Sequence, residues 1–572
     1  MKTSVIRKIA ECAAAASADQ PELPVSQNFS PGRRKFLGTA RGLTAAAWAA
    51  GAIGASPFLA SDGTQAHADT TYGRTRANQA YTIRRNAAQA EFDLPLVYHR
   101  HNDDEVLYSN RIGNYSKALP HNSLGEVDPA AYNLYLNAIR SGEPIDFENI
   151  ALGGTTKLTD PQSGLAFAME GTDSGNLTEP PAPSVSGQER ASEAVENYWM
   201  ALLRDVAFTN YASDATVAKA CAELSKLPAF TGPRIHGRVT PQTLFRGFTA
   251  GDVVGPYLSQ FMLQTVYFGA LTIEQRYATY LPGVDYMTDF GSWLAVQNGQ
   301  GPFGANVFDP QLRYLRDGRG MCAFVHVDVL YQAYFMAMLW LMRSASFNVG
   351  NPYNTSRTQV GFGTFGSPHI NVLMTEVCAL ALRAQWFQKW WVHRALRPEA
   401  FGGLVHNTET AAVRYPLSDD VLNSHAVAET FEKTGSYLLP IAFPEGSPTH
   451  PSYGSGHATV AGACVTLLKA FFNTDNVAFP NPVVPTTDGL ALEPYTGADA
   501  GQITLTGELN KLASNIAQAR NIAGVHWRSD ATQAMILGEA MAISVLRDQR
   551  RCYNESFTGF TFTKLDGTRV TI

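Results

Sequence analysis

Residues 450–472 read HPSYGSGHATVAGACVTLLKAFF, an apolar run of helical length that is entered through a Gly-Ser-Gly turn at 454–456. The pattern predicts a helix over 457–473. A helix N-terminus carries backbone N–H groups without partners and the positive end of the helix dipole, so it stabilises an anion. Ser455 can donate its hydroxyl and Gly456 its backbone N–H to such an anion, since glycine permits close approach. An ordinary serine cap at a glycine turn has the same sequence, so this segment alone leaves both interpretations open.

Outward from this stretch, apolar residues at helical spacing dominate the chain from residue 192 onward. Strand-like alternation is scarce, and 557–572 is the best candidate for a terminal β-hairpin. These patterns predict a mainly α protein of bundled helices with minor β-hairpins. The other expected helices cover 192–207, 213–225, 251–268, 273–280, 322–343, 369–396, 421–436, 507–523 and 530–550.

Composition narrows the possible partners. The 572 residues are 45% hydrophobic and 16% charged, whereas about 25% charged residues is usual for globular domains. Much of the surface is therefore neutral or covered, which favours a homo-oligomer. The net charge is −6, and a nucleic-acid partner would need a basic field. We expect no nucleic-acid partner, and any anion site must be a local gathering of positive charge.

The first 68 residues resemble a twin-arginine export signal. Arg33 and Arg34 precede an Ala-rich apolar run over 43–60, and a small-x-small cleavage pattern follows at 66–68. The alternative is a basic tail followed by an Ala-rich helix. With the signal interpretation, the protein is exported to a periplasmic or extracellular location.

The mature chain, 69–572, is expected to form one large domain. Its first part, 69–190, is rich in Gly, Pro, Asn and Asp and predicts loops and a few helices that wrap a helical core at 191–572. No membrane span is expected, because the best internal apolar run, 329–342, is shorter than the roughly 20 residues that a bilayer needs and contains Gln332.

Two further segments contain basic side chains that could bind an anion. The stretch 388–403, QKWWVHRALRPEAFGG, places Lys389 near a helix end and Arg397 directly before a proline that disfavours helical geometry. The stretch 519–530, ARNIAGVHWRSD, contains Arg520, a glycine break, then His526 in a short loop with Asp530 placed to orient its ring. Singly, each could be a solvated cation or an ordinary core histidine.

The three segments together are more specific than each alone. In chain order they read K-x7-R-P, S-G-H and R-x5-H-x3-D. They supply three cations, two neutral donors and two histidines, which is the set of groups that a tetrahedral or trigonal oxyanion needs. His457, next to the anion, can exchange protons near neutral pH.

This arrangement resembles the superfamily that joins vanadium-dependent haloperoxidases with the acid phosphatases related to them. Four segments are further similar to vanadium bromoperoxidases of red algae and cyanobacteria: KALPHNSLGEVDPAAYN, VHVDVLYQAYF, FGTFGSPHI and GSPTHPSYGSGHA. The resemblance implies two four-helix bundles, a vanadate cofactor, a possible structural calcium, and a dimer or dimer-based dodecamer. The implied reaction oxidises bromide or iodide with hydrogen peroxide to hypohalous acid, which halogenates small organic nucleophiles.

The resemblance also implies roles for individual residues. His526 would bond vanadium, and His457 would be the acid–base histidine, with Lys389 and His450 as further catalytic groups. Trp386 and His450 would line the halide pocket; red-algal members typically have arginine at the position of Trp386, so this chain departs from the pattern there. The residues that would hydrogen-bond the vanadate oxygens are Lys389, Arg397, Ser455, Gly456 and Arg520.

Two other functions fit the same residues. In a soluble acid phosphatase inhibited by vanadate, His526 would be the nucleophile and His457 would protonate the leaving alcohol. The second alternative is a non-catalytic exported protein that binds an oxyanion or only forms an assembly.

Overall fold

The computed structural model of the protein describes residues 70–572. The chain divides into two compact units, Met1–Asn86 and Ala87–Ile572. The twin-arginine motif, the cleavage pattern and the domain boundary expected at residue 68 lie outside the described residues, so they stay predictions.

The fold is mainly α, as predicted, and every described sheet is a two-stranded antiparallel hairpin or ribbon. The strands are β1 (Val266–Phe268), β2 (Leu271–Ile273), β3 (Tyr277–Tyr280), β4 (Phe308–Arg313), β5 (Val483–Pro485), β6 (Leu492–Pro494), β7 (Thr561–Thr563) and β8 (Arg569–Thr571). The helices are α4 (Thr70–Phe92), α5 (Asp104–Leu107), α6 (Pro129–Ser141), α7 (Pro144–Glu148), α8 (Gln188–Leu202), α9 (Ala215–Lys226), α10 (Phe290–Gln297), α11 (Gly318–Val327), α12 (Gln332–Ser344), α13 (Ser367–Phe387), α14 (Pro398–Glu409), α15 (Asp419–Leu422), α16 (His425–Thr434), α17 (Gly456–Phe471), α18 (Leu505–Ile522) and α19 (Arg528–Cys552).

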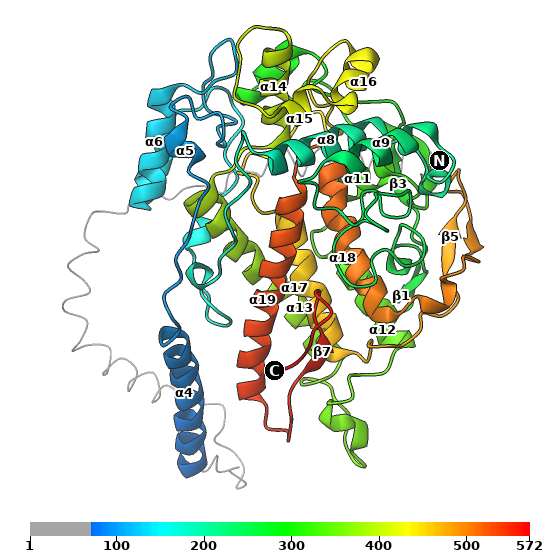
Figure 1. The fold of residues 1–572 in the computed structure, drawn as a ribbon. Coiled ribbons are helices and arrows are strands. Elements are labelled where there is room, and N and C mark those ends of the chain that lie inside the picture. Colours follow the sequence, from blue (N-terminus) through cyan, green and yellow to red (C-terminus); the bar gives the residue numbers. More distant parts are fainter. Residues whose placement is uncertain (1–69) are drawn as a thin grey trace, which may run out of the picture. The chain divides into compact units, whose positions relative to one another are not determined.

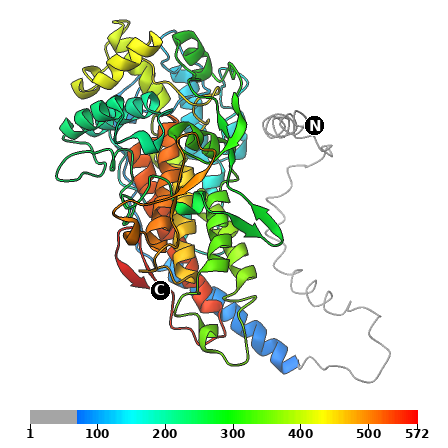
Figure 2. The same ribbon diagram turned by 90° about the vertical axis from the view of Figure 1, so that its right-hand side faces the viewer.

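Helix α17 is the central helix of the core. It packs against α13, α18 and α19, and these helices lie side by side in both ribbon views (Figures 1 and 2). Two glycines allow the close approach of α17 and α19: a Cβ on Gly462 would lie 2.0 Å from the Met535 carbonyl oxygen, and one on Gly538 would lie 1.9 Å from that of Thr459. The apolar stretch quoted first is therefore buried on nearly every side.

Two predicted helices are wrong. The range 251–268 contains only a 3-10 turn, Gln260–Met262, and strand β1, because Gly251 and Gly255 adopt positive φ angles of 89° and 73°. The range 273–280 ends in β3, which pairs with β4. Its Tyr-Ala-Thr-Tyr sequence favours an extended strand, since aromatic and β-branched side chains pack well on a pleated surface.

The helix predicted over 322–343 is in fact two helices. Helix α11 ends at Val327, and α12 begins at Gln332 after a turn that contains Asp328. Within residues 70–572, no single helix is both long and apolar enough to cross a bilayer; only α11 and α12 counted together, bent by 96°, reach that criterion by length and composition.

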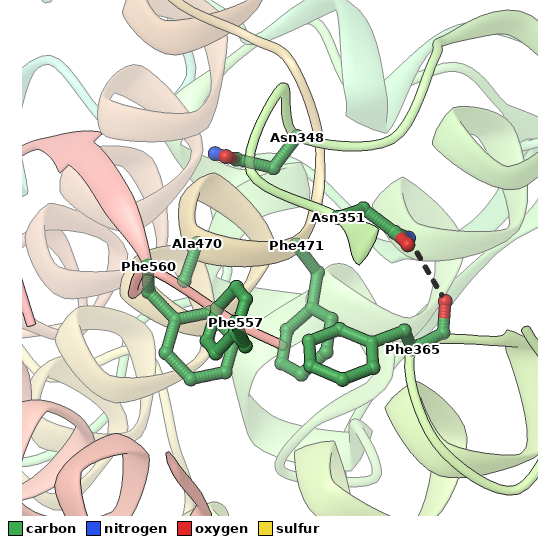
Figure 3. A pocket seen from close by; sticks show the side chains of 7 residues that line it. All are labelled: Asn348, Asn351, Phe365, Ala470, Phe471, Phe557 and Phe560. Atoms are coloured by element: carbon green, nitrogen blue, oxygen red, sulfur yellow. Dashed lines mark hydrogen bonds between the residues drawn. The ribbon is translucent and has the colours of Figure 1, made fainter. Parts of the chain in front are cut away.

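The expected terminal hairpin is present as β7 and β8. Beside it lies a small pocket in which four phenylalanines gather, Phe365, Phe471, Phe557 and Phe560 (Figure 3). Asn351 closes the pocket by donating a hydrogen bond to the Phe365 carbonyl oxygen at 3.2 Å. The hairpin is thus fastened to the end of α17 by aromatic packing, and the pocket contains none of the predicted site residues.

Candidate oxyanion site

Helix α17 begins where it was predicted. Its serine can act both as the helix cap and as a hydroxyl donor to an anion. Ser455 is the N-cap, and its hydroxyl oxygen accepts the Ala458 N–H. That contact uses a lone pair, so the hydroxyl proton is still available for an anion. Gly456 begins the helix, and a Cβ there would lie 3.1 Å from the Trp386 ring, so glycine is needed for this close packing.

The three predicted cations are buried and converge near this helix end. Lys389 donates to the carbonyl oxygens of Pro451 and Ser452 at 2.8 and 2.9 Å, just before the Gly-Ser-Gly turn. Arg397 lies 2.9 Å from His526 Nε2 through its Nη1 atom. Arg520 ends α18 in the same region, and its Nη1 donates to the Val325 carbonyl oxygen.

The local backbone explains how these cations reach the site. The helix predicted over 369–396 stops at Phe387, and a π-helical turn over Gln388–His393 carries Lys389. Arg397 is extended, with φ −81° and ψ 151°, because Pro398 begins α14 directly after it. The wide turn and the proline together turn both long side chains inward from one short segment.

The three cations are buried away from any carboxylate partner in the described residues. Among the described residues, no carboxylate lies within ion-pair distance of Lys389, Arg397 or Arg520, although all three are buried. Burial, with the neighbouring Arg397 adding to it, holds the pKa of Lys389 well below its usual value, and burial lowers the pKa of Arg397 to about 10. The Nε atom of Arg520 is buried without a hydrogen-bond partner. A bound oxyanion would offset this positive charge and accept the unused donors, so the residues present fit one.

The Asp530 carboxylate orients the His526 ring. Its Nδ1 lies 2.8 Å from Asp530 Oδ2, which also accepts the Trp527 N–H at 3.2 Å and the Ser452 hydroxyl. Assigning the Nδ1 proton to this contact leaves the Nε2 lone pair on the side of Arg397. Helix α19 begins at Arg528 with Trp527 as N-cap, and the Asp530 carboxylate binds the Trp527 N–H.

His457 has a partner that the sequence reasoning missed. Its Nε2 lies 3.0 Å from Asp328 Oδ1, in the turn between α11 and α12. The His457 side chain is 18% exposed, so it lies between the buried cations and solvent. The segment VHVDVLYQAYF carried this aspartate, but the single long helix predicted there concealed that it lies in a turn.

Trp386 and His450 form one wall of the site. Their ring centroids are 4.7 Å apart, and the Lys389 Nζ atom is 5.6 Å from the Trp386 ring centroid. His450 Nδ1 lies 2.8 Å from Arg397 Nη2. The structure therefore brings both predicted halide-pocket residues against the predicted anion ligands.

The wrapping region contributes buried charge, which the sequence reasoning also missed. Lys117 donates to Glu399 at 3.0 Å and to the carbonyl oxygens of Glu445 and Ser447 at 2.9 and 2.6 Å. Glu179 accepts from Gln385 at 2.9 Å, and burial raises the pKa of its carboxyl to about 8. These contacts join the loop before His450, the segment after Arg397 and helix α13, so the N-terminal loops hold the site together.

The fold and site define a class: a helical-bundle protein with a buried cluster of basic and histidine side chains at the N-terminus of its central helix. The family model described as the second helical-bundle domain of VCPO matches residues 372–555. The vanadium-dependent bromoperoxidases of Corallina pilulifera and Ascophyllum nodosum are each 33% identical to this chain over 87% of its length, and the matches cover 99% and 93% of those proteins. The homohexameric structure of the second vanadate-dependent bromoperoxidase of Ascophyllum nodosum matches with a TM-score of 0.84 and 31% identity, covering 90% of this chain and 93% of that one. The chain belongs to the vanadium-dependent bromoperoxidase family.

Proposed function

We propose that this protein is a vanadate-dependent haloperoxidase that oxidises bromide, and iodide, with hydrogen peroxide to hypohalous acid, which then halogenates organic compounds. The observation that carries the proposal is the convergence of Lys389, Arg397, Arg520 and His526 on the N-terminus of α17. Burial and the neighbouring Arg397 and Lys389 hold the pKa of His526 well below its usual value, so its ring is neutral and able to act as a ligand.

Vanadate, when bound, supplies a Lewis-acid centre that polarises an attached oxygen. The three cations would hold its oxygens together with the Ser455 hydroxyl and the Gly456 N–H, and His526 Nε2 would face the metal. Charge-assisted hydrogen bonds of this kind are roughly twice as strong as neutral ones. The helix N-terminus adds further stabilisation of the negative charge.

The remaining residues manage protons and the halide. His457 would take up and return the proton of hydrogen peroxide, and Asp328 at 3.0 Å fixes its ring. Lys389 would supply positive charge beside an oxygen of the bound vanadate. Trp386 and His450, packed against Lys389 and Arg397, form the surface on which a halide would approach.

One purified preparation, assayed with and without added vanadate, tests the function. Peroxide-dependent bromination of an organic dye that requires vanadate supports the proposal. Hydrolysis of an aryl phosphate inhibited by vanadate, without bromination, would instead support the acid phosphatase alternative, with His526 as nucleophile. Neither activity despite bound vanadate would favour the non-catalytic oxyanion-binding alternative.

Assembly and location complete the proposal. The subunit count proposed is a dimer or a dimer-based dodecamer. The homohexameric relative supports self-association in general, as do large apolar side chains left exposed, among them Leu96, Tyr98, Phe167 and Met169. Light scattering of the purified protein tests the subunit count. Export through the twin-arginine signal is tested by N-terminal sequencing of the mature chain, with cleavage expected near residue 68.

A structural calcium also belongs to the proposal, without assigned ligands. In residues 70–572 no group of three or more His, Cys, Asp or Glu side chains is arranged to hold a metal ion. Backbone carbonyl oxygens would therefore have to provide much of a calcium site. Metal analysis of the purified protein after dialysis against a chelator tests for tightly held calcium.

A further inference from the structure

Arg520 is held less tightly than the other predicted anion ligands. Its only hydrogen bond within the described residues is the one from Nη1 to the Val325 carbonyl oxygen, at 2.9 Å. Its Nε is buried without a partner. Lys389 and Arg397 instead make two or more hydrogen bonds each to neighbouring carbonyl oxygens and rings. The direction of the Arg520 guanidinium must therefore come largely from packing.

One aromatic ring takes part in that packing. The guanidinium carbon of Arg520 lies 5.4 Å from the ring centroid of Phe443, which is fully buried in the loop before His450. The other neighbour of Phe443 is the imidazole of His326, stacked at a centroid distance of 3.9 Å with the planes 18° apart. A stacked ring and a cation over an aromatic face are both favourable contacts, and both are stronger away from water.

His326 is itself fixed at both ring nitrogens. Nδ1 contacts the Tyr280 hydroxyl of β3, and Nε2 lies 2.5 Å from Glu445 Oε1. Glu445 belongs to the same loop as Phe443, and its backbone carbonyl accepts from Lys117. The imidazole thus joins α11, β3 and this loop, although it touches none of the predicted anion ligands directly.

The geometry points to His326 as a positioning residue that sets the orientation of Arg520 toward the bound oxyanion through the ring of Phe443. Two neighbouring residues at the end of α11 then position Arg520: Val325 directly through its carbonyl oxygen, and His326 through the ring of Phe443. This inference rests on the proposed function, because Arg520 acts there as an anion ligand. His326 lies within the quoted segment VHVDVLYQAYF, but no role was assigned to it or to Phe443 above.

The test measures vanadate binding to the metal-free protein by equilibrium dialysis, independently of turnover. We expect His326→Ala to weaken vanadate binding about tenfold. His326→Phe keeps the stacked ring and should restore most of the affinity, whereas His326→Gln keeps polar contacts without the ring and should not. The matched control is His406→Ala, which removes another partly buried imidazole stacked on a phenylalanine, Phe290 at 5.3 Å, and should leave the affinity unchanged.

A double-mutant cycle distinguishes positioning from general loss of structure. In an Arg520→Lys background the planar guanidinium is gone, so His326→Ala should cause less than a twofold further loss. An equal tenfold loss in both backgrounds, or wild-type affinity in His326→Ala, overturns the inference.

If His326→Ala does not fold, Tyr280→Phe takes its place, because it removes one of the two polar contacts that fix the His326 ring. We expect Tyr280→Phe to weaken vanadate binding about threefold, and no loss of affinity would overturn the inference. Absence of vanadate binding by the wild-type protein would instead refute the proposed function.

Discussion

Asp530 offers the sharpest test of how the site is organised. Its Oδ2 atom accepts from His526 Nδ1, the Trp527 N–H and the Ser452 hydroxyl, while its Oδ1 atom has no partner. In Asp530→Asn the amide oxygen can keep these three contacts as neutral hydrogen bonds, which are about half as strong. The amide NH2 then takes the unpartnered position and is left buried without an acceptor.

The size of the effect follows from these contacts. A hydrogen bond to a charged group contributes about 1.5–3 kcal/mol and a neutral one about 1 kcal/mol. We therefore expect Asp530→Asn to weaken vanadate binding by about 1–2 kcal/mol, or roughly 5- to 30-fold. Asp530→Ala removes all three contacts, so the tautomer of His526 is no longer fixed, and the loss should reach about 100-fold, the upper range for a group that orients a metal ligand.

Vanadate titration of the metal-free protein, followed by dialysis or intrinsic fluorescence, measures both changes. Asp252→Asn is the matched control: Asp252 is also buried and accepts a backbone N–H, from Gly247 at 2.7 Å, but takes no part in the site. An Asp530→Ala protein that folds and binds vanadate within threefold of the wild type would refute the orienting role of Asp530.

Three further changes have definite expected outcomes. Lys389→Met, with vanadate bound, should slow bromide oxidation at least tenfold in steady-state assays, because it removes the positive charge beside the reacting oxygen; a wild-type rate would contradict the role of Lys389. His450→Phe keeps a ring against Trp386 but loses the contact with Arg397, so kcat/KM for bromide should fall about tenfold relative to that for chloride; an unchanged halide ratio would contradict the halide-pocket assignment. The pKa of the Glu179 carboxyl has its ordinary value of 4.5 in the unfolded chain and is raised by burial to about 8 in the folded one. The native state therefore binds more protons between these pH values, and the free energy of unfolding falls as the pH rises. Glu179→Gln should remove that part of the fall, as measured by urea denaturation at pH 5 and pH 8, and an unchanged slope would show that Glu179 is ionised throughout.

The sequence by itself determined the helical class, and it predicted which residues form the site. Helical periodicity is a local property, so α17, α18 and α19 lie close to their predicted ranges. Motif spacing singled out the candidate anion-binding groups before any fold was known. The structure brings Lys389 against the carbonyl oxygen of Pro451 and Arg397 against His526, so the three segments meet.

Local patterns failed where apolar spacing was followed in spite of glycines, and where a turn lies inside an apolar run. Residues 251–280 look helical by spacing, but positive φ angles at Gly251 and Gly255 and the pairing of β3 with β4 exclude a helix there. The split between α11 and α12 places Asp328 in a turn, and no periodicity predicts that a distant residue, His457, will be its partner.

Only the tertiary structure decided the surroundings of the site. Glu179 and Lys117 come from a loop-rich region without regular periodicity, yet they end as buried charges against α13 and the loop before His450. His326 lies in a predicted helix, but its contact with Phe443, a ring more than a hundred residues away in the chain that also lies beside Arg520, is set by the tertiary structure alone. Helix and motif patterns depend on neighbours in sequence, whereas burial, pKa and the partners of a charged group depend on which distant segments exclude water from it.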